Sequence, residues 1–300
     1  MNRSLLKGIA YLTVACLLWG GMAAAVQYVF AASPEFTPLG LVTYRQLGAG
    51  LVYVILGSIF MPARLYAPFK NRQDCFDVLL GGGLIFGAHY CFFESIYYSN
   101  AGTGAIFLTT IPLFAAIYYA VFQGRSIRKA EIVAFFLAVA GVALIVTDGD
   151  FASLKFSPLA IVWGMASAIF AAAFSIQPLR VMSRVGVTPV ISWAVMTGGL
   201  IAAIFCPPWS VSVHWTTYTA LSYAFIVLGG TVIAFWCYLA CLKYITPVVA
   251  GLLTCLEPLS AFLFSIVLLG VTLGVWQMVG IALILLNVAV LALAKPDKTT

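Results

Sequence analysis

The chain has 300 residues, of which 63% are hydrophobic and only 8% carry a charged side chain. With a mean hydropathy of +1.09, this composition excludes an ordinary soluble globular domain, which is far more polar. The net charge of +6 comes from short loops between apolar segments, so it predicts contact with anionic lipid and is a poor indication of nucleic-acid binding.

Ten apolar segments are long enough to cross a membrane, for which a helix needs about 20 residues. They lie, in chain order, at residues 8–30, 38–60, 76–98, 101–123, 130–148, 158–181, 188–206, 217–241, 247–269 and 275–294. The connections between them are too short to hold a soluble domain. The sequence therefore predicts an all-α membrane protein of ten transmembrane helices.

The first segment shares some features with a cleaved signal peptide. Arg3 and Lys7 precede it, and Ala31-Ala32-Ser33 at its end is similar to a small-residue cleavage site. Its apolar run is longer than the usual ~7–15 residues, and the sixth segment contains its counterpart. We therefore expect this segment to be retained as the first transmembrane helix.

The Lys and Arg residues indicate how the chain is oriented. Thirteen of the fifteen lie before the first segment or after the second, fourth, sixth, eighth and tenth segments. The other gaps contain one basic residue, Lys155, beside Asp148 and Asp150. Because basic loops stay on the cytoplasmic side of a membrane, we expect both termini in the cytoplasm.

The second half of the chain repeats features of the first. Trp19-Gly20 in the first segment matches Trp163-Gly164 in the sixth, and Pro112 and Pro258 lie at equivalent places in the fourth and ninth. Each half has five segments, an odd number, so the two halves cross the membrane in opposite senses. The sequence predicts two inverted five-helix repeats, residues 1–150 and 151–300, an arrangement typical of secondary transporters whose substrates bind near the midplane.

On these residues the chain resembles the EamA-type branch of the drug/metabolite transporter superfamily over essentially its whole length. The resemblance rests on the Trp-Gly pairs, Arg45, Tyr98-Ser99-Asn100-Ala101, Tyr244-Ile245-Thr246-Pro247 and Leu256-Glu257-Pro258-Leu259. It implies a ten-helix exporter of small metabolites, often amino acids or related compounds, in a bacterial cytoplasmic membrane. The family often has a glutamate after the fourth and ninth segments, where this chain has Phe122-Gln123-Gly124-Arg125 and Leu269-Gly270-Val271-Thr272. This departure weakens inferences about gating or oligomeric contacts.

Glu257 is one of four candidates for an ionisable residue deep within the apolar segments, where each costs about 2.5–3.5 kcal/mol on insertion scales. It stands directly before Pro258, which lacks a backbone donor and frees the carbonyl of Thr254, as Pro112 frees that of Leu108. Two interpretations stay open. Glu257 either binds a proton or a substrate amine at a broken helix, or it is a structural glutamate beside a kink.

The other three ionisable residues are Arg45, His89 and Glu94. The planar fork of Arg45 suits a substrate carboxylate, but Arg45 is equally placed to pair with Glu94. His89 is either a neutral, hydrogen-bonded side chain or a residue of the substrate cavity. His89 and Glu94 also form an H-x4-E pattern like that of some acyltransferases, but five residues turn a helix by about 140°, so the side chains diverge.

Aromatic residues accompany these polar ones, and they either wall a substrate cavity or face lipid. The candidates for the cavity are Trp19, near mid-depth, and Tyr90, Trp163 and Trp236. The seven cysteines form no CxxC pair, and two thiols on one helix face make a poor metal site. No metal or cofactor is expected.

Together these features predict a secondary active transporter and not an enzyme. We expect it to export a small metabolite such as an amino acid or its derivative by alternating access, with proton coupling through Glu257 as an option. Export of many drugs or of lipophilic cations is the alternative. A membrane transferase would need clustered carboxylates or an activated nucleophile, and a channel would need charge rings or a filter loop, and the sequence shows neither pattern.

Overall fold

The computed structural model describes residues 3–33, 35–99, 101–154, 157–269 and 274–293. Within these ranges nine helical stretches are long and apolar enough to span a membrane, and Pro247–Ser260 is a tenth, shorter apolar one. The expected all-α membrane fold is therefore confirmed. Lys155, residues 270–272 and the basic residues at 295 and 298 lie outside the described ranges.

The helical elements follow the expected segments, but several segments are divided. In chain order they are α1 (Arg3–Ala32), α2 (Pro38–Phe60), α3 (Pro62–Leu65), η1 (Ala67–Lys70), α4 (Arg72–Tyr97), α5 (Ala101–Leu108), α6 (Ile111–Gln123), α7 (Lys129–Thr147), η2 (Phe151–Ser153), α8 (Pro158–Ile176), α9 (Leu179–Val185), α10 (Val187–Phe205), η3 (Pro208–Ser210), α11 (Thr217–Val227), η4 (Leu228–Ile233), α12 (Ala234–Cys241), α13 (Pro247–Leu253), α14 (Leu256–Leu269) and α15 (Val275–Leu293). The element η4 is one turn of π-helix.

Three membrane helices begin with a Ser/Thr-Pro pair, which explains where they start. Thr37, Ser157 and Thr246 cap α2, α8 and α13 by accepting a hydrogen bond from the amide three residues later, and a proline follows each. A hydroxyl at the cap satisfies an otherwise unpaired amide, and proline is tolerated directly after it. The seventh segment differs, because Gly186 at φ +92° precedes α10 and Thr188 is not its cap.

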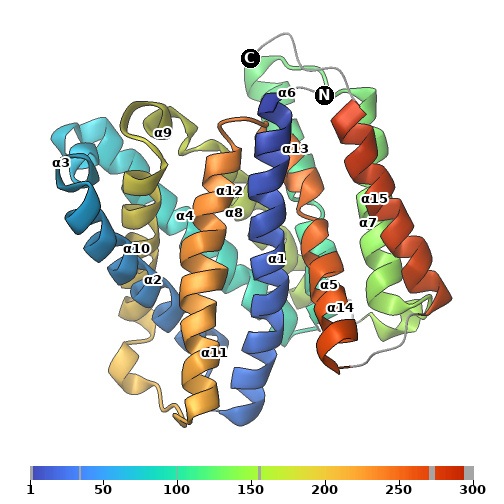
Figure 1. Ribbon diagram of the computed structural model, residues 1–300, viewed down its shortest axis with the longest axis horizontal. Coiled ribbons are helices and arrows are strands. Elements are labelled where there is room, and N and C mark those ends of the chain that lie inside the picture. Colours follow the sequence, from blue (N-terminus) through green and yellow to red (C-terminus); the bar gives the residue numbers. More distant parts are fainter. Residues whose placement is uncertain (1–2, 34, 100, 155–156, 270–273, 294–300) are drawn as a thin grey trace.

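Helices of one half pack against helices of the other, and the set of contacts stays the same when each helix is replaced by its counterpart in the other half. Helix α2 packs on α10 and α7 packs on α15, so each helix faces its own counterpart. Helix α4, in the third segment, packs on α8, in the sixth. Exchanging the halves turns this into a contact between the eighth segment and the first, which α11 and α12 make with α1. Two inverted five-helix repeats produce this pattern. Figure 1 shows that α1 begins and α15 ends at the same end of the bundle.

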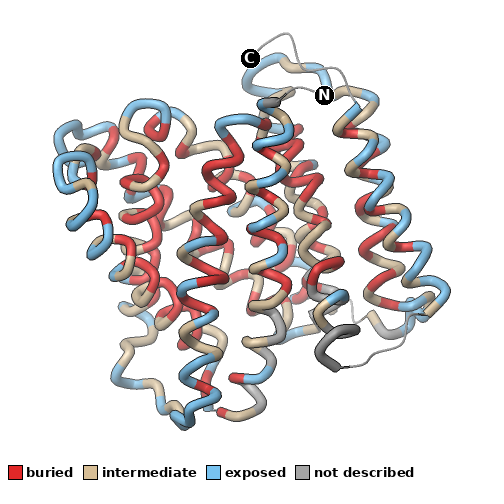
Figure 2. Tube along the Cα trace, in the orientation of Figure 1, coloured by how far each residue is buried: buried red, intermediate tan, exposed pale blue. Residues whose placement is uncertain are grey.

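Buried residues concentrate in the middle of the bundle. Figure 2 shows them along α10, α12 and α13, whereas the outward faces of α7 and α15 are exposed. The largest group of buried apolar side chains draws on helices of both halves, from Leu12 of α1 to Val248 of α13. The two halves therefore share one core.

The end of the bundle where α1 begins also carries α3, α9 and the α6–α7 connection (Figure 1). We call it the basic end, because it holds most of the basic loop residues that the structure describes: Lys7, Arg64, Lys70, Arg72, Arg125, Arg128, Lys129, Arg180, Arg184 and Lys243. At the opposite end, Asp148 and Asp150 follow α7.

Two ion pairs at the basic end join α4 of the first half to α9 of the second. Arg184 pairs with Asp74, and Arg180 pairs with Asp77, its Nε lying 3.2 Å from Oδ2. The carboxylate of Asp77 therefore takes part in a structural contact between the halves. These pairs bring the end of the sixth segment against the third.

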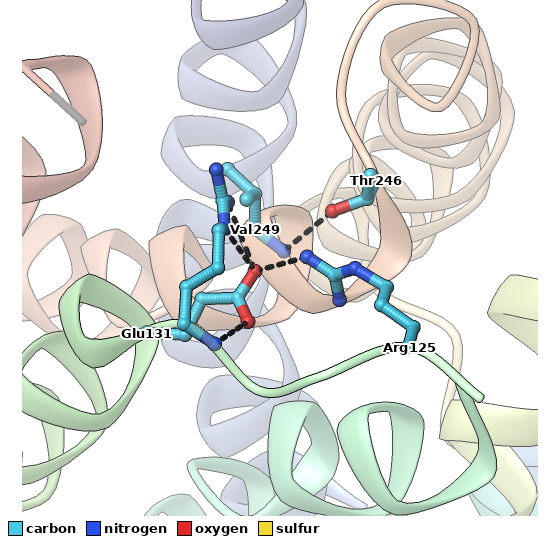
Figure 3. A network of polar contacts seen from close by, with 5 residues as sticks. Arg125, Glu131, Thr246 and Val249 are labelled. Atoms are coloured by element: carbon cyan, nitrogen blue, oxygen red, sulfur yellow. Dashed lines mark hydrogen bonds and ion pairs between the residues drawn. The ribbon is translucent and has the colours of Figure 1, made fainter. Parts of the chain in front are cut away.

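A third carboxylate at the basic end binds two arginines (Figure 3). Glu131, the third residue of α7, is 2% exposed and lies 2.6 Å from Arg125 and 2.9 Å from Arg128. It also accepts a hydrogen bond from the backbone amide of Arg128 at 3.2 Å. The same view shows Thr246 capping α13 through the amide of Val249. This network fixes the α6–α7 connection beside the start of the ninth segment.

The fourth and ninth segments are broken at equivalent places, but one turn earlier than the prolines suggested. Helix α5 ends at Leu108 and α13 at Leu253, and the prolines are the second residue of α6 and the third of α14. Proline is tolerated in the first turn of a helix. The carbonyl of Thr254, expected to be free, accepts from the amide of Glu257 at 2.9 Å; that expectation was wrong.

The carbonyls at the second break have side-chain partners instead. Asn287 of α15, which is fully buried, donates to the carbonyl of Leu252 at 2.9 Å, and Thr254 donates to that of Gly251 at 2.7 Å. Unpaired backbone groups are costly in an apolar interior, so these bonds make the break tolerable. The broken segments meet at Gly251, where a Cβ would lie 3.2 Å from the Cβ of Pro112.

Candidate functional site

Arg45 lies at the seam between the two halves. It is 3% exposed on α2 of the first half, and its Nε donates to Thr231 Oγ1 of the second half at 2.8 Å. Its guanidinium carbon lies 5.7 Å from the ring centre of Phe235, on the ring face, which is a favourable position for a cation. The sequence also allowed Arg45 to pair with Glu94, but no ion pair joins these two described residues.

The π-turn η4 presents the acceptor for Arg45. Thr231 Oγ1 itself donates to the carbonyl of Ile226, five residues earlier, at 2.8 Å. Gly230 in the same turn lets α1 approach closely, since a Cβ there would lie 2.4 Å from the sulfur of Met22. Single π-turns inside α-helices are rare and frequent at functional sites. This turn places Thr231 beside Arg45.

His89 of α4 lies next to the same arginine. Its Nδ1 is 2.8 Å from Gln46 Nε2, and its ring packs edge-on against Phe235 at 5.3 Å between ring centres. Gln46 Nε2 also lies 3.5 Å from the carbonyl oxygen of Ile85. Because an amide nitrogen only donates, Nδ1 accepts and a neutral His89 carries its proton on Nε2.

Trp19 completes the aromatic part of this site. It is 8% exposed, and its Nε1 donates to the carbonyl of Gly230 at 3.0 Å. Its ring centre lies 5.1 Å from that of Phe235 and 5.6 Å from that of Tyr238. Tyr238 is fixed in turn by a hydrogen bond with Ser175 of α8 at 2.5 Å. The rings of Trp19, Phe235 and Tyr238 are thus held together by residues of α1, α8, η4 and α12, which come from both halves.

Glu257 brings the opposite charge to the site. It is half-buried as the second residue of α14, where the positive end of the helix dipole stabilises a carboxylate. No ion pair joins the described side chains of Glu257 and Arg45. The two residues come from different halves, so each half supplies one charged group and the two do not neutralise each other by direct contact.

We refer to these residues as the central cluster: Trp19, Arg45, Gln46, His89, Thr231, Phe235 and Glu257. The sequence predicted four of the seven. Gln46 was missed although a glutamine within an apolar segment is itself unusual, and Thr231 was missed although Gly229-Gly230 before it marked a close helix approach. Nothing in the sequence singled out Phe235 among 22 phenylalanines.

Three of the predicted aromatic residues lie elsewhere. Tyr90 packs edge-on against Trp163 at 5.8 Å and stacks on Phe86 at 5.8 Å. Trp236 faces the basic end, where its Nε1 donates to Thr188 Oγ1 at 3.0 Å. The structure therefore does not bring Tyr90, Trp163 and Trp236 into the central cluster.

Two cavities adjoin Trp236 at the basic end. One, of about 240 Å³, lies between α2 and η4 and is lined by Tyr53, Phe60 and Val232 among others. The other, of about 230 Å³, is lined by Tyr11, Arg64, Lys243 and Tyr244 among others. Among the residues that the structure describes, no three His, Cys, Asp or Glu side chains come together as a metal site.

An inverted bundle of membrane helices with charged residues enclosed between its halves is the arrangement of a multi-pass transporter. The chain matches the profile of the EamA-like transporter family twice, over residues 6–147 and 158–293, and it belongs to that family.

Among curated proteins, the "uncharacterized inner membrane transporter YicL" of Salmonella typhimurium (strain LT2) is 30% identical over 290 residues, covering 96% of this chain and 95% of YicL. A crystal structure that is 20% identical shares the fold, with a TM-score of 0.79 over 96% of both chains. The family expected from the sequence is confirmed.

Proposed function

We propose that this transporter exports small zwitterionic metabolites, amino acids or their derivatives, and binds them at the central cluster. The observation that supports this proposal is that membrane helices of the two halves carry Arg45 and Glu257, and no ion pair joins these two described residues. A zwitterion bridges such a pair, with its carboxylate on the guanidinium fork and its ammonium on the carboxylate. A zwitterionic substrate therefore gains two charge-assisted contacts on binding, one to each residue.

The same arrangement argues against a lipophilic cation as the main substrate. A cation bound by Glu257 would also meet the positive charge of Arg45, which is held in place by Thr231. Buried like charges repel strongly where water is excluded. The aromatic faces of Trp19 and Phe235 are then available for the apolar side chain of an amino acid.

In this proposal the halves at residues 1–150 and 151–300 rock against each other and expose the central cluster to one side and then the other. The basic end faces the cytoplasm of a bacterium, following the positive-inside rule, and the protein lies in the inner membrane, as the name of its relative YicL states for that protein. Protons and the substrate ammonium compete for Glu257, which would couple export to proton entry.

Counterflow in proteoliposomes tests the proposal, with amino acids first selected by growth under toxic analogues. Wild-type protein should accelerate uptake of labelled substrate when unlabelled substrate is preloaded, and a pH gradient should drive net transport. Glu257→Gln should abolish the pH-driven component. Glu94→Gln is the matched control, since Glu94 is also half-buried in a membrane helix but lies outside the central cluster. Equal pH-driven transport by wild type and both variants would remove Glu257 from the mechanism.

A further inference from the structure

The two cavities at the basic end are parts of one concave surface. They share Met61, Thr188 and Trp236, and both open beside the start of α10. We call the combined space the vestibule. Its volume is on the scale of a small-molecule pocket and too small for the two chains of a phospholipid.

One part of the vestibule is cationic. Arg64 and Lys243 line it and are exposed, and neither has a side-chain hydrogen bond or ion pair among the described residues. The three carboxylates that the structure describes at this end, Asp74, Asp77 and Glu131, are all paired with other arginines. The charges of Arg64 and Lys243 therefore remain uncompensated.

The start of α10 adds to this positive character. Gly186 and Val187 line the vestibule, and Gly186 caps the helix without a side-chain acceptor for the first amides. Uncapped amides at a helix start carry partial positive charge. They reinforce the two cationic side chains on the same wall.

The other part of the vestibule is apolar and aromatic. Trp236 is held by Thr188 and packs edge-on against Tyr11 at 5.8 Å, and Tyr11 stacks on Tyr244 at 6.1 Å. Beyond Trp236 the lining is made of apolar side chains such as Phe60. An apolar group of the size of one aromatic ring suits this space.

The apolar part lies directly behind the central cluster. Val232 forms part of its wall and accepts a hydrogen bond from the hydroxyl of Tyr53. The preceding residue, Thr231, binds Arg45. A molecule held in the vestibule is thus separated from the central cluster by the π-turn η4.

We propose that the vestibule is a binding site for small amphipathic carboxylates, which place their carboxylate between Arg64 and Lys243 and their apolar group beside Trp236. Its role as the site where substrate is first captured rests on the proposed function, but the binding itself does not. Attraction of a carboxylate to two uncompensated cations raises the local substrate concentration at the mouth of the transport path.

The test uses fluorine NMR on the full chain in nanodiscs of phosphatidylcholine, with 4-fluorophenylacetate as the probe. Trifluoroacetate lacks the ring, and 4-fluorophenylacetamide lacks the charge. We expect 4-fluorophenylacetate to bind at least tenfold more tightly than either. The double variant R64Q/K243Q should lose at least tenfold in affinity, whereas K70Q/R72Q, with the same charge loss at the same end, should change it less than twofold.

Equal losses in the two double variants would overturn the proposal, because the attraction would then belong to the whole basic end. Equal binding of the acetamide, or of trifluoroacetate, would also overturn it. So would a failure of the probe to bind while phosphatidylglycerol is retained by wild type and lost by R64Q/K243Q, since the site would then hold lipid. Glu257→Gln should leave probe binding unchanged, so failure of the transport mechanism and failure of this site give different results.

Discussion

Replacing Thr231 with valine removes the oxygen that holds Arg45 and leaves the shape of the side chain almost unchanged. The lost bond joins Arg45 Nε to Thr231 Oγ1 at 2.8 Å, and Arg45 is 3% exposed. A hydrogen bond to a charged group contributes about 1.5–3 kcal/mol when its partner is left unsatisfied. We therefore expect Thr231→Val to lower the free energy of unfolding by about 2 kcal/mol.

The assay is unfolding of the purified protein in a titration with sodium dodecyl sulfate. Thr43→Val is the matched control, because Thr43 is also a fully buried threonine, and its hydroxyl bonds only to the neutral carbonyl of Leu39. That neutral bond should contribute about 1 kcal/mol or less. If the two variants unfold with the same free energy, Thr231 does not hold a charged Arg45, and the electrostatic basis of the central cluster is refuted.

Two further predictions each compare a pair of variants in the same assay. Gly82→Ala should lower the free energy of unfolding by about 1–3 kcal/mol, because its Cβ would lie 2.5 Å from the Cβ of Thr197 on α10, whereas Gly83→Ala meets no atom within 4 Å and should be neutral or slightly stabilising. Glu131→Gln removes the charge of a buried carboxylate that lies between two arginines, and it should lower the free energy of unfolding by about 3 kcal/mol. Asp77→Asn should cost less than about 1 kcal/mol, since the Arg180 side chain is 52% exposed. Equal effects within either pair would contradict these contacts.

The membrane segments were predictable because the cost of placing polar groups in lipid acts along the whole chain. Helices α2 and α10 end within one residue of their expected limits. The positions of the helix breaks were predicted less well. Proline has no backbone N–H to donate to the carbonyl four residues earlier, so it indicates a break nearby. In the structure the helix ends about one turn earlier than the proline suggested, and Thr254 and Asn287 bind the exposed carbonyls there.

The central cluster was predictable in part for the same energetic reason. Burying Arg45 or Glu257 is costly enough to identify them as special, but burying an aromatic ring is not. Helices that are apolar on all sides give no periodic signal for the face that turns inward. Trp19 and Trp163 occupy matching places in the repeat, yet only Trp19 packs against Phe235. Which ring faces the seam depends on helix rotation, which the sequence pattern leaves open.

The two breaks at Leu108 and Leu253 are alike in backbone but different in chemistry. Helix α14 carries a carboxylate in its first turn, whereas α6 begins with Ile111 and Pro112. In a transporter built from identical inverted halves, the outward-open and inward-open forms would be related by a two-fold axis in the membrane plane and would have equal free energy. Here the halves differ at this break, and we expect Glu257 to be one of the residues that makes the two forms of the empty transporter unequal in free energy.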